Sequence, residues 1–296
     1  MTDGENKRED GQTGISLVMA TLGRVDEVAR AVEALLKQTS DRFELIVVDQ
    51  NPDDRLVPVL ARATAQGMAV RHVRQAEPNQ CTARNAGLAL ASMAFVAFPD
   101  DDCWYEPQTI ERVLDRMTAP EAPDGLLIRW VEQDPRGAPE HIVELRKWRE
   151  FRAVHASAIS QFFRRELIQS LGGFDPAFGL HAWFGGAEET DLMFRVLESG
   201  AVVRYVPDPL VHHHVHTRLI GADWRSACRS ARKRSRGTGA LYAKHRLSPF
   251  VILRGFASPL LKSLWRRQGW DIVAQGAWTT FGRMEGFCRW RWKHSA

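Results

Sequence analysis

The chain has 296 residues, of which 44% are hydrophobic and 26% are charged, a composition typical of globular proteins with a substantial core. Its four cysteines show neither a CxxC pair nor a short metal spacing, which favours free thiols in a reducing compartment over a disulfide framework. No stretch reaches the roughly 18 uninterrupted apolar residues of a transmembrane helix. The polar residues 1–14 lack the apolar core of a signal peptide, so we expect a disordered tail there.

Charge is unevenly distributed along the chain. From Arg204 to the end there are 18 Lys and Arg against 4 Asp and Glu, whereas residues 1–203 hold 22 against 32. The basic segment also contains six of the ten tryptophans. Such a composition indicates an anionic partner, either a membrane surface or a nucleic acid.

Strands and helices alternate from residue 15 onwards. Apolar runs predict strands at 15–20, 43–48, 70–73 and 94–98, and apolar residues at helical spacing predict helices at 28–36, 57–66 and 82–91. This alternation predicts an α/β fold with a doubly wound, mostly parallel sheet over about residues 15–115. No GxGxxG follows the first strand and no GxxxxGK loop occurs, so neither a Rossmann dinucleotide site nor a P-loop is expected.

The fourth apolar run ends in three consecutive acids, Asp100, Asp101 and Asp102. Ligands of open α/β sheets bind just outside the carboxyl ends of the strands. Adjacent carboxylates repel one another, and a divalent cation that also binds phosphate oxygens relieves that repulsion. The alternative is a solvated acidic loop or a helix cap.

Two further groups of polar residues lie in the second half of the chain. Glu188, Glu189 and Asp191 stand at the start of a predicted helix, where acids either cap the helix or carry chemistry. Four histidines follow a short predicted strand at 202–206. On a strand His212, His214 and His216 would share one face and His213 the other, and no acid or cysteine stands at zinc spacing.

Four segments in succession resemble the motifs of family 2 glycosyltransferases with the GT-A fold. They are SLVMATLGR at 16–24, ELIVVD at 44–49, ARNAG at 83–87 and FPDDD at 98–102. The GGFD turn at 172–175 and EETDL at 188–192 resemble the acceptor motif of the same family, and GRMEG at 282–286 resembles members that build bacterial surface polysaccharides. The resemblance implies a catalytic domain over 15–218, with a nucleotide-sugar half to about 115 and an acceptor half from about 116, and a basic helical extension over 219–296.

The resemblance also implies an inverting transfer of a sugar from a nucleoside-diphosphate sugar to an acceptor hydroxyl, with Mn²⁺ or Mg²⁺. Glu189 would be the general base, with Asp191 as second choice. Asp102 and one histidine would hold the metal, His213 being preferred to His212 and His214. The residues that it assigns to the nucleotide sugar are Thr21, Arg24, Asp49, Arg84, Asp100 and Asp101.

We expect a cytoplasmic enzyme whose basic helices contact the inner face of the membrane and whose acceptor is a glycan or a lipid-linked glycan. The alternative for the apolar faces of those helices is packing on the catalytic domain or across a dimer. A sugar nucleotidyltransferase would need a Gly-rich basic loop after the first strand. Residues 21–24 are too short and too poor in glycine to form one, which disfavours this class. A non-enzymatic nucleic-acid-binding protein would leave the acids and histidines unexplained, so no nucleic acid is expected.

Overall fold

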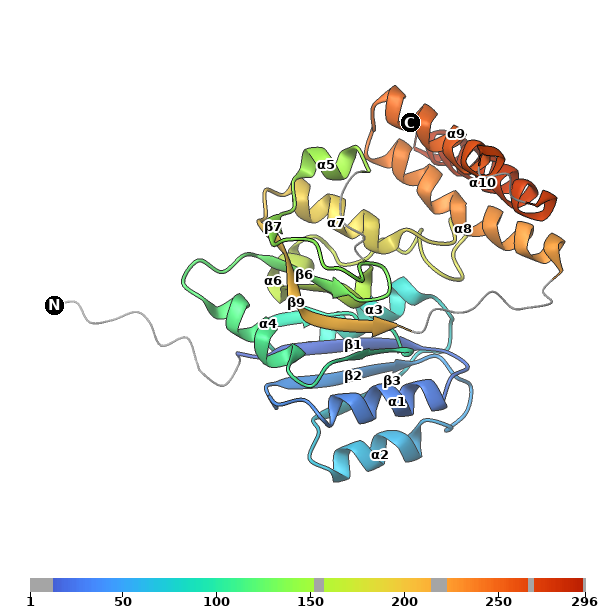
Figure 1. Cartoon of the computed structure of the whole chain (residues 1–296). Coiled ribbons are helices and arrows are strands. Elements are labelled where there is room, and N and C mark those ends of the chain that lie inside the picture. The colour runs from blue at the N-terminus through green and yellow to red at the C-terminus, as the bar shows by residue number, and fades with distance from the viewer. Residues whose placement is uncertain (1–12, 152–156, 214–222, 266–268, 295–296) are drawn as a thin grey trace.

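The computed structural model describes residues 13–151, 157–213, 223–265 and 269–294. Over these residues the chain forms a mixed nine-stranded sheet with helices on both faces and a group of three C-terminal helices to one side (Figure 1). Most of the predicted N-terminal tail, His214 and His216 lie outside the described residues.

The first half of the sheet is parallel, as the sequence predicts. Its strands are β1 (Ile15–Thr21), β2 (Phe43–Asp49), β3 (Val70–Arg74) and β4 (Phe95–Ala97), which lie side by side in the order β3-β2-β1-β4. One face is covered by α1 (Asp26–Leu35) and α2 (Val57–Ala65) and the other by α3 (Gln80–Leu90). Thr21 pairs with Asp49 in register, so the ends of β1 and β2 bring these two side chains to one edge.

Beyond β4 the sheet is mixed. β8 (Gln161–Arg164) lies antiparallel between β4 and β6 (Gly125–Trp130), and β9 (Val203–His213) lies parallel to β6. β5 (Cys103–Tyr105) and β7 (His141–Ile142) pair antiparallel with β9. The remaining helical elements are α4 (Thr109–Thr118), α5 (Leu145–Arg149), a 3₁₀ turn (Ala158–Ser160), α6 (Arg165–Ser170) and α7 (Glu188–Glu198).

β9 is longer than the predicted strand at 202–206, and its length matters for the site. It continues through Pro207 and Pro209, neither of which has an N–H to donate, and its register with β6 shifts there. At its end β9 pairs with β5, and this pairing sets His213 opposite Cys103. The residue before Cys103 is Asp102, so this pairing brings the histidine segment to the three acids.

The C-terminal extension consists of α8 (Trp224–Lys244), α9 (Pro249–Trp265) and α10 (Trp270–Lys293). α10 packs closely on α8 because glycines stand at the contact: a Cβ on Gly239 would lie 1.8 Å from the Arg283 carbonyl oxygen, and one on Gly286 would lie 2.0 Å from that of Arg236. Glu285 of α10 accepts hydrogen bonds from Arg232 and Arg236 of α8. None of the helices within the described residues is long and apolar enough to cross a membrane.

Candidate active site

Side chains from β1 and from the acidic stretch meet at the carboxyl edge of the sheet. The Thr21 hydroxyl donates a hydrogen bond of 2.7 Å to Asp101. Arg24 contacts Asp101 at 2.6 Å and Asp102 at 2.5 Å. Burial raises the pKa of Asp101 against the opposing effects of Thr21 and Arg24. The structure therefore brings together Thr21, Arg24 and Asp101, three of the residues that the family resemblance assigns to the nucleotide sugar.

A second group consists of Asp100, Asp102 and His213. Each offers one ligand atom, and these atoms lie within 4.8 Å of one another. The His213 Nε2 atom is 3.0 Å from Asp102 Oδ1. Burial acts to raise the pKa of Asp102, but His213 and Arg24 outweigh it and lower that pKa below its usual range. Carboxylate oxygens with an imidazole nitrogen suit Mn²⁺, and the carboxylates also suit Mg²⁺, so this donor set fits the metals that the sequence suggests.

The ring of His212 contacts two glutamates, whereas the ring of His213 contacts Asp102. The ring nitrogens of His212 lie 3.1 Å from Glu132 and 3.2 Å from Glu106, and the ring stacks on Trp104. Glu132 also accepts a hydrogen bond from the His213 backbone N–H. The preference for His213 over His212 is therefore supported by geometry, while His214 is outside the described residues. Sequence reasoning assigned Asp100 to the nucleotide sugar and did not foresee that its carboxylate lies in one group with Asp102 and His213.

A cavity of about 300 Å³ lies against the three acids and His213. Its lining also includes Leu180 and His181, from the 179–187 loop that precedes α7. His181 has a left-handed backbone with φ of 69°, which is uncommon for a residue other than glycine and occurs often at functional sites. Sequence reasoning did not identify these two residues, because an irregular loop carries no periodic signal. The other residues that line the cavity are Ala20, Leu22, Arg24, Gln50 and Gln80.

Asp49 lies at the same edge but does not line this cavity. Its fully buried carboxylate accepts a 2.7 Å hydrogen bond from the Asn51 amide, lies 2.9 Å from His72 Nε2 and pairs with Arg74 at 3.2 Å. The Asn51 side chain in turn accepts a hydrogen bond from the Gly23 N–H. Asp49 therefore orders the loops that follow β1 and β2.

Arg84 connects the acids to α7. It is only 2% exposed and lies 2.8 Å from Asp100 and 3.4 Å from Glu188, with its guanidinium over the Phe174 ring. Burial acts to lower the pKa of Arg84, but Asp100 and Glu188 outweigh it and raise that pKa. A permanent positive charge therefore lies between the acidic stretch and the start of the helix that carries Glu189.

Glu189 lies in the first turn of α7 and is partly exposed. Its desolvated position raises its pKa above the ordinary carboxyl value, and the adjacent charge of Glu188 raises it further. A carboxylate with a raised pKa is a stronger base than an ordinary one, which suits it to accept a proton.

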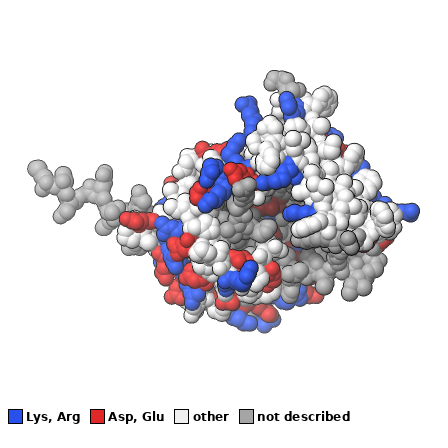
Figure 2. Space-filling view, turned by 45° about the horizontal axis from the view of Figure 1, so that its top comes forward, with Lys and Arg blue, Asp and Glu red and all other residues white. Residues whose placement is uncertain are grey.

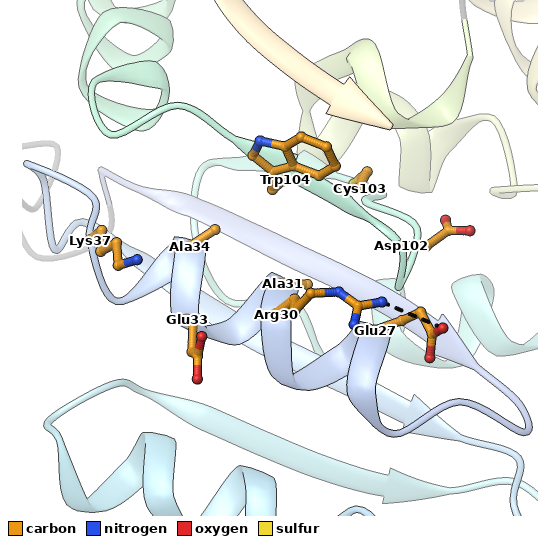
Figure 3. A pocket seen from close by; sticks show the side chains of 9 residues that line it. All are labelled: Glu27, Arg30, Ala31, Glu33, Ala34, Lys37, Asp102, Cys103 and Trp104. Atoms are coloured by element: carbon orange, nitrogen blue, oxygen red, sulfur yellow. Dashed lines mark ion pairs between the residues drawn. The ribbon is translucent and has the colours of Figure 1, made fainter. Parts of the chain in front are cut away.

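A second cavity of about 380 Å³ lies on the other side of Asp102, between α1 and β5 (Figure 3). Ala31, Ala34 and Trp104 supply apolar wall, and the charged Glu27 and Arg30 on α1 are 3.5 Å apart. Asp102 lines both cavities, whereas Asp100 and Asp101 line the first of these two and not the second. The carboxyl edge of the sheet is thus open on both sides of this aspartate.

The sequence profile of Glycosyl transferase family 2 matches residues 16–170, more than half of the chain. The chain belongs to glycosyl transferase family 2. The matched segment includes the strand ends, the three acids and Arg84, so the described edge of the sheet belongs to the part of the chain that identifies the family.

Curated relatives of this family 2 glycosyltransferase are distant. Bacillus subtilis EpsH, a glycosyltransferase by name, is 23% identical over 218 residues, which are 70% of this chain and 62% of EpsH. The glucosyl-dolichyl phosphate glucuronosyltransferase of Haloferax volcanii is 26% identical over 229 residues, 71% of this chain and 72% of that one. The pre-mycofactocin glycosyltransferase of Mycobacterium tuberculosis is 32% identical over 191 residues, which are 58% of this chain and 37% of that one. The match to this chain spans less than two thirds of EpsH and of the M. tuberculosis protein.

Solved glycosyltransferases share the fold. S. aureus TarS 1–349, solved in complex with UDP-GlcNAc, superimposes with a TM-score of 0.58 at 14% identity, covering 90% of each chain. The mannosyltransferase PcManGT of Pyrobaculum calidifontis, solved with GDP-Man and Mn²⁺, gives 0.63 at 16% identity, covering 95% of this chain and 87% of that one. The fold of this family 2 glycosyltransferase is therefore GT-A, as the sequence predicts.

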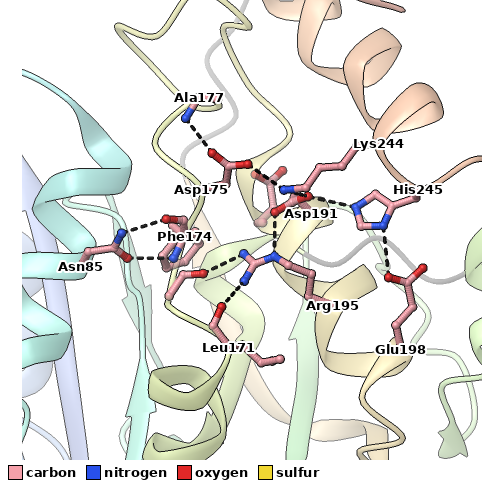
Figure 4. A network of polar contacts seen from close by, with 12 residues as sticks. Asn85, Leu171, Phe174, Asp175, Ala177, Asp191, Arg195, Glu198, Lys244 and His245 are labelled. Carbon is pink, nitrogen blue, oxygen red and sulfur yellow. Dashed lines mark hydrogen bonds and ion pairs between the residues drawn. The ribbon is translucent and has the colours of Figure 1, made fainter. Parts of the chain in front are cut away.

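Asp191, the second candidate for the base, is surrounded by basic groups (Figure 4). Its fully buried carboxylate lies 2.7 Å from Lys244 Nζ, 2.9 Å from His245 Nε2 and 2.9 Å from Arg195 Nε. Lys244 also pairs with Asp175 of the GGFD turn at 2.7 Å. This network therefore fixes α7 and the GGFD turn to the end of α8.

The same turn is held from the other side by Asn85 of the ARNAG segment. The Asn85 amide donates to the Phe174 carbonyl at 2.8 Å and accepts from the Phe174 N–H at 2.7 Å. Two residues away in the same segment, Gly87 allows α3 to approach the sheet, because a Cβ there would lie 2.4 Å from Val18. Within this segment, Arg84 faces the acids, while Asn85 and Gly87 serve packing.

We predict that Asp191→Asn destabilises the protein by about 3 kcal/mol at neutral pH, because buried cations lose their counter-charge. Burial acts to raise the pKa of Asp191, but His245, Lys244 and Arg195 outweigh it and lower that pKa to about 2. A carboxyl group whose pKa is lower in the folded than in the unfolded state stabilises the fold at pH values above its unfolded pKa. The difference in unfolding free energy between the wild type and Asp191→Asn should therefore disappear as the pH falls from about 4 towards 2. Urea unfolding at several pH values measures this, with the exposed Asp115→Asn as control; equal stabilities of Asp191→Asn and wild type at neutral pH would contradict it.

Proposed function

We propose that this enzyme transfers a sugar, with inversion, from a nucleoside-diphosphate sugar to an acceptor hydroxyl, and that Asp100, Asp102 and His213 hold a Mn²⁺ or Mg²⁺ ion on the diphosphate. The observation that carries the proposal is the convergence of these ligand atoms within 4.8 Å beside a cavity at the carboxyl edge of the sheet. The PcManGT complex with GDP-Man and Mn²⁺ supports it, because that protein has the same fold.

On the donor side, the residues have separate tasks. Thr21 and Arg24 hold the Asp101 carboxylate in one orientation, in which it can accept hydrogen bonds from ribose hydroxyls. Asp49, held by three neighbours, sets the shape of the loops around the base. Arg84 orients Asp100 and adds positive charge near the phosphates.

On the acceptor side, Glu189 accepts the hydroxyl proton while the acceptor oxygen bonds to the anomeric carbon. The bond from that carbon to the diphosphate oxygen breaks, and its electron pair leaves with the diphosphate. When bound, the cation neutralises the charge that develops on this leaving group. We choose Glu189 over Asp191 because the Asp191 carboxylate is buried and already engaged by three basic groups.

The pH dependence of turnover tests this assignment. Glu189 acts deprotonated and its pKa is raised by its partial burial and by Glu188, so kcat/KM should increase with pH along a limb that lies above the ordinary carboxyl range. Glu188→Gln removes the neighbouring charge and should move this limb to lower pH, whereas Glu198→Gln at the far end of α7 should leave it in place. A limb that stays unchanged in Glu188→Gln would contradict the assignment.

The acceptor that we propose is a glycan or lipid-linked glycan used in polysaccharide or glycolipid synthesis, at the inner face of the cytoplasmic membrane. The basic, Trp-rich extension supports a site next to a membrane. The name of the Haloferax volcanii relative, with its dolichyl phosphate, describes a lipid-linked compound. No contact with nucleic acid is part of this proposal.

The donor class is tested by a thermal-shift panel of UDP-, GDP-, dTDP- and CMP-sugars, each with and without Mn²⁺. Ligands that bind the folded state raise its melting temperature by mass action. We expect a Mn²⁺-dependent increase with a nucleoside-diphosphate sugar and a smaller one with CMP-sugars, which carry a single phosphate. No increase with any nucleotide sugar would count against the proposed function.

A further inference from the structure

The outer side of α9 is apolar along its whole length. Exposed apolar side chains recur at intervals of three, four, seven or eight residues, so they share one face of the helix. Phe250 is 68% exposed and Trp265 is 87% exposed. The other large members of this face are Leu253, Leu261 and Leu264.

α10 carries a similar face. Its exposed apolar side chains are Trp270, Trp278, Phe281, Met284 and Trp292, with Trp270 86% exposed. The glycines of α10 lie on other sides of the helix: Gly276 packs on α9, where a Cβ would lie 2.8 Å from the Pro259 carbonyl oxygen, and Gly286 packs on α8. The two apolar faces lie on neighbouring helices, and Arg232 of α8 borders the face of α10, with its guanidinium 5.4 Å from the Trp278 ring and 4.6 Å from the Phe281 ring. Monomeric soluble proteins seldom expose this much contiguous apolar surface without a partner.

Positive charge borders this surface. Lys262 on α9 and Arg291 and Lys293 on α10 are exposed beside the apolar residues. On α8 the exposed Arg229 and Lys233 stand three residues before and one residue after Arg232, which contacts Trp278 and Phe281, and no ion pair to Arg229 or Lys233 occurs among the described residues. In Figure 2 the surface on the side of these helices is mainly white, with blue groups around it and little red.

We propose that the docking face, defined as the exposed apolar residues of α9 and α10 with their bordering Lys and Arg, lies in the interface of an anionic lipid bilayer. Trp and cationic side chains next to an apolar helix face are typical of helices that lie at a membrane surface. A second copy of the chain fits less well, because pairing two identical faces would bring like charges together. This inference deepens the proposed function and rests on it for its biological meaning.

The docking face is also connected to the active site. Trp183 of the 179–187 loop lies between two guanidinium groups, 4.4 Å from Arg236 on α8 and 4.0 Å from Arg289 on α10. A Cβ on Gly237 would lie 1.9 Å from the Gly186 carbonyl oxygen, so α8 directly supports this loop. A membrane bound by α9 and α10 would therefore hold the loop that faces the donor cavity near the lipid surface.

Flotation of the full-length chain with vesicles tests the proposal. Phosphatidylcholine vesicles are compared with vesicles in which about a third of the lipid is phosphatidylglycerol, at low and high salt. We expect the wild type to float with the anionic vesicles only, and less at high salt. Leu253→Ser/Leu264→Ser should reduce the bound fraction at least about tenfold, because two apolar side chains no longer leave water.

Two matched variants complete the experiment. Ile142→Ser replaces a side chain of similar size and 56% exposure on β7, outside the docking face, and should bind as the wild type does. Arg229→Ser/Lys233→Ser should reduce binding about tenfold through lost attraction to anionic lipid. The four substituted side chains of the two double variants are exposed, so both variants should keep the melting temperature of the wild type.

Several outcomes would overturn the proposal: no flotation of the wild type, unchanged flotation of Leu253→Ser/Leu264→Ser, or a wild-type dimer in sedimentation velocity that this variant dissociates while vesicles are not bound. Salt-sensitive retention on DNA without vesicle binding would overturn it as well. Vesicle binding without any nucleotide-sugar binding would uphold the docking face and reject the proposed function. Nucleotide-sugar binding without vesicle binding would uphold the proposed function and reject the docking face.

Discussion

Asp102→Asn is expected to abolish the Mn²⁺-dependent part of nucleotide-sugar binding and to reduce kcat/KM by at least about 10³-fold. The carboxylate of Asp102 contacts both Arg24 and His213. No neighbouring acid can take over its negative charge at this position unless the site rearranges. Asparagine keeps the shape and one acceptor oxygen but removes the negative charge that attracts a divalent cation. The thermal shift with nucleotide sugar, measured with and without Mn²⁺, reports the binding, and nucleoside-diphosphate release reports turnover.

Asp115→Asn is the matched control, because it makes the same change at an exposed position on α4. It should retain wild-type binding and turnover. A second control is the melting temperature of Asp102→Asn without ligand, which shows that the variant is folded. If folded Asp102→Asn retained the Mn²⁺-dependent shift, the assignment of this aspartate to the metal would be wrong.

Glu189→Gln is expected to reduce kcat by about 10³-fold while leaving the affinity for the nucleotide sugar close to that of the wild type. The amide cannot accept the proton of the acceptor hydroxyl. Donor binding is retained because Glu189 does not line the donor cavity and makes no contact with its acids in the described residues. The two readouts are kcat with the acceptor present and the thermal shift with donor and Mn²⁺.

Two variants separate the chemical role of Glu189 from a capping role. Glu189→Asp keeps the carboxylate but shortens its reach by about 1 Å, so it should be about 10²-fold slower than the wild type and faster than Glu189→Gln. Glu166→Gln changes a glutamate in the first turn of another helix, α6, and should leave kcat unchanged. Equal activities of Glu189→Gln and Glu189→Asp would contradict the role of Glu189 as base.

The parallel half of the sheet could be predicted from the sequence because its strands are short apolar runs ended by polar residues. The same local signal pointed to the acids Asp100, Asp101 and Asp102 at the edge of the sheet, whereas Thr21 was assigned only by the family resemblance. The helical character of the C-terminal extension was also predicted, and α8, α9 and α10 confirm it.

Other features depend on long-range pairing and carry no local signal. The extension of β9 past Pro207 and Pro209 comes from its pairing with β6 and β5, and the pairing with β5 places His213 beside Asp102. From the sequence Asp191 was the second choice for the base after Glu189, and both lie in one helical turn. Its ion pairs with Lys244 and His245 come from a helix more than 50 residues later in the chain, and periodicity cannot show them.

The central claim is that a divalent cation at Asp100, Asp102 and His213 holds the diphosphate of a nucleotide sugar. Titration of the wild type with Mn²⁺ under electron paramagnetic resonance, in which the signal of free Mn²⁺ disappears on binding, tests it most directly. We predict uptake of about one Mn²⁺ per chain that is strongly enhanced by the nucleoside diphosphate identified in the thermal-shift panel and is lost in Asp102→Asn. Mn²⁺ uptake that is the same with and without nucleotide, or the same in the wild type and Asp102→Asn, would contradict the claim.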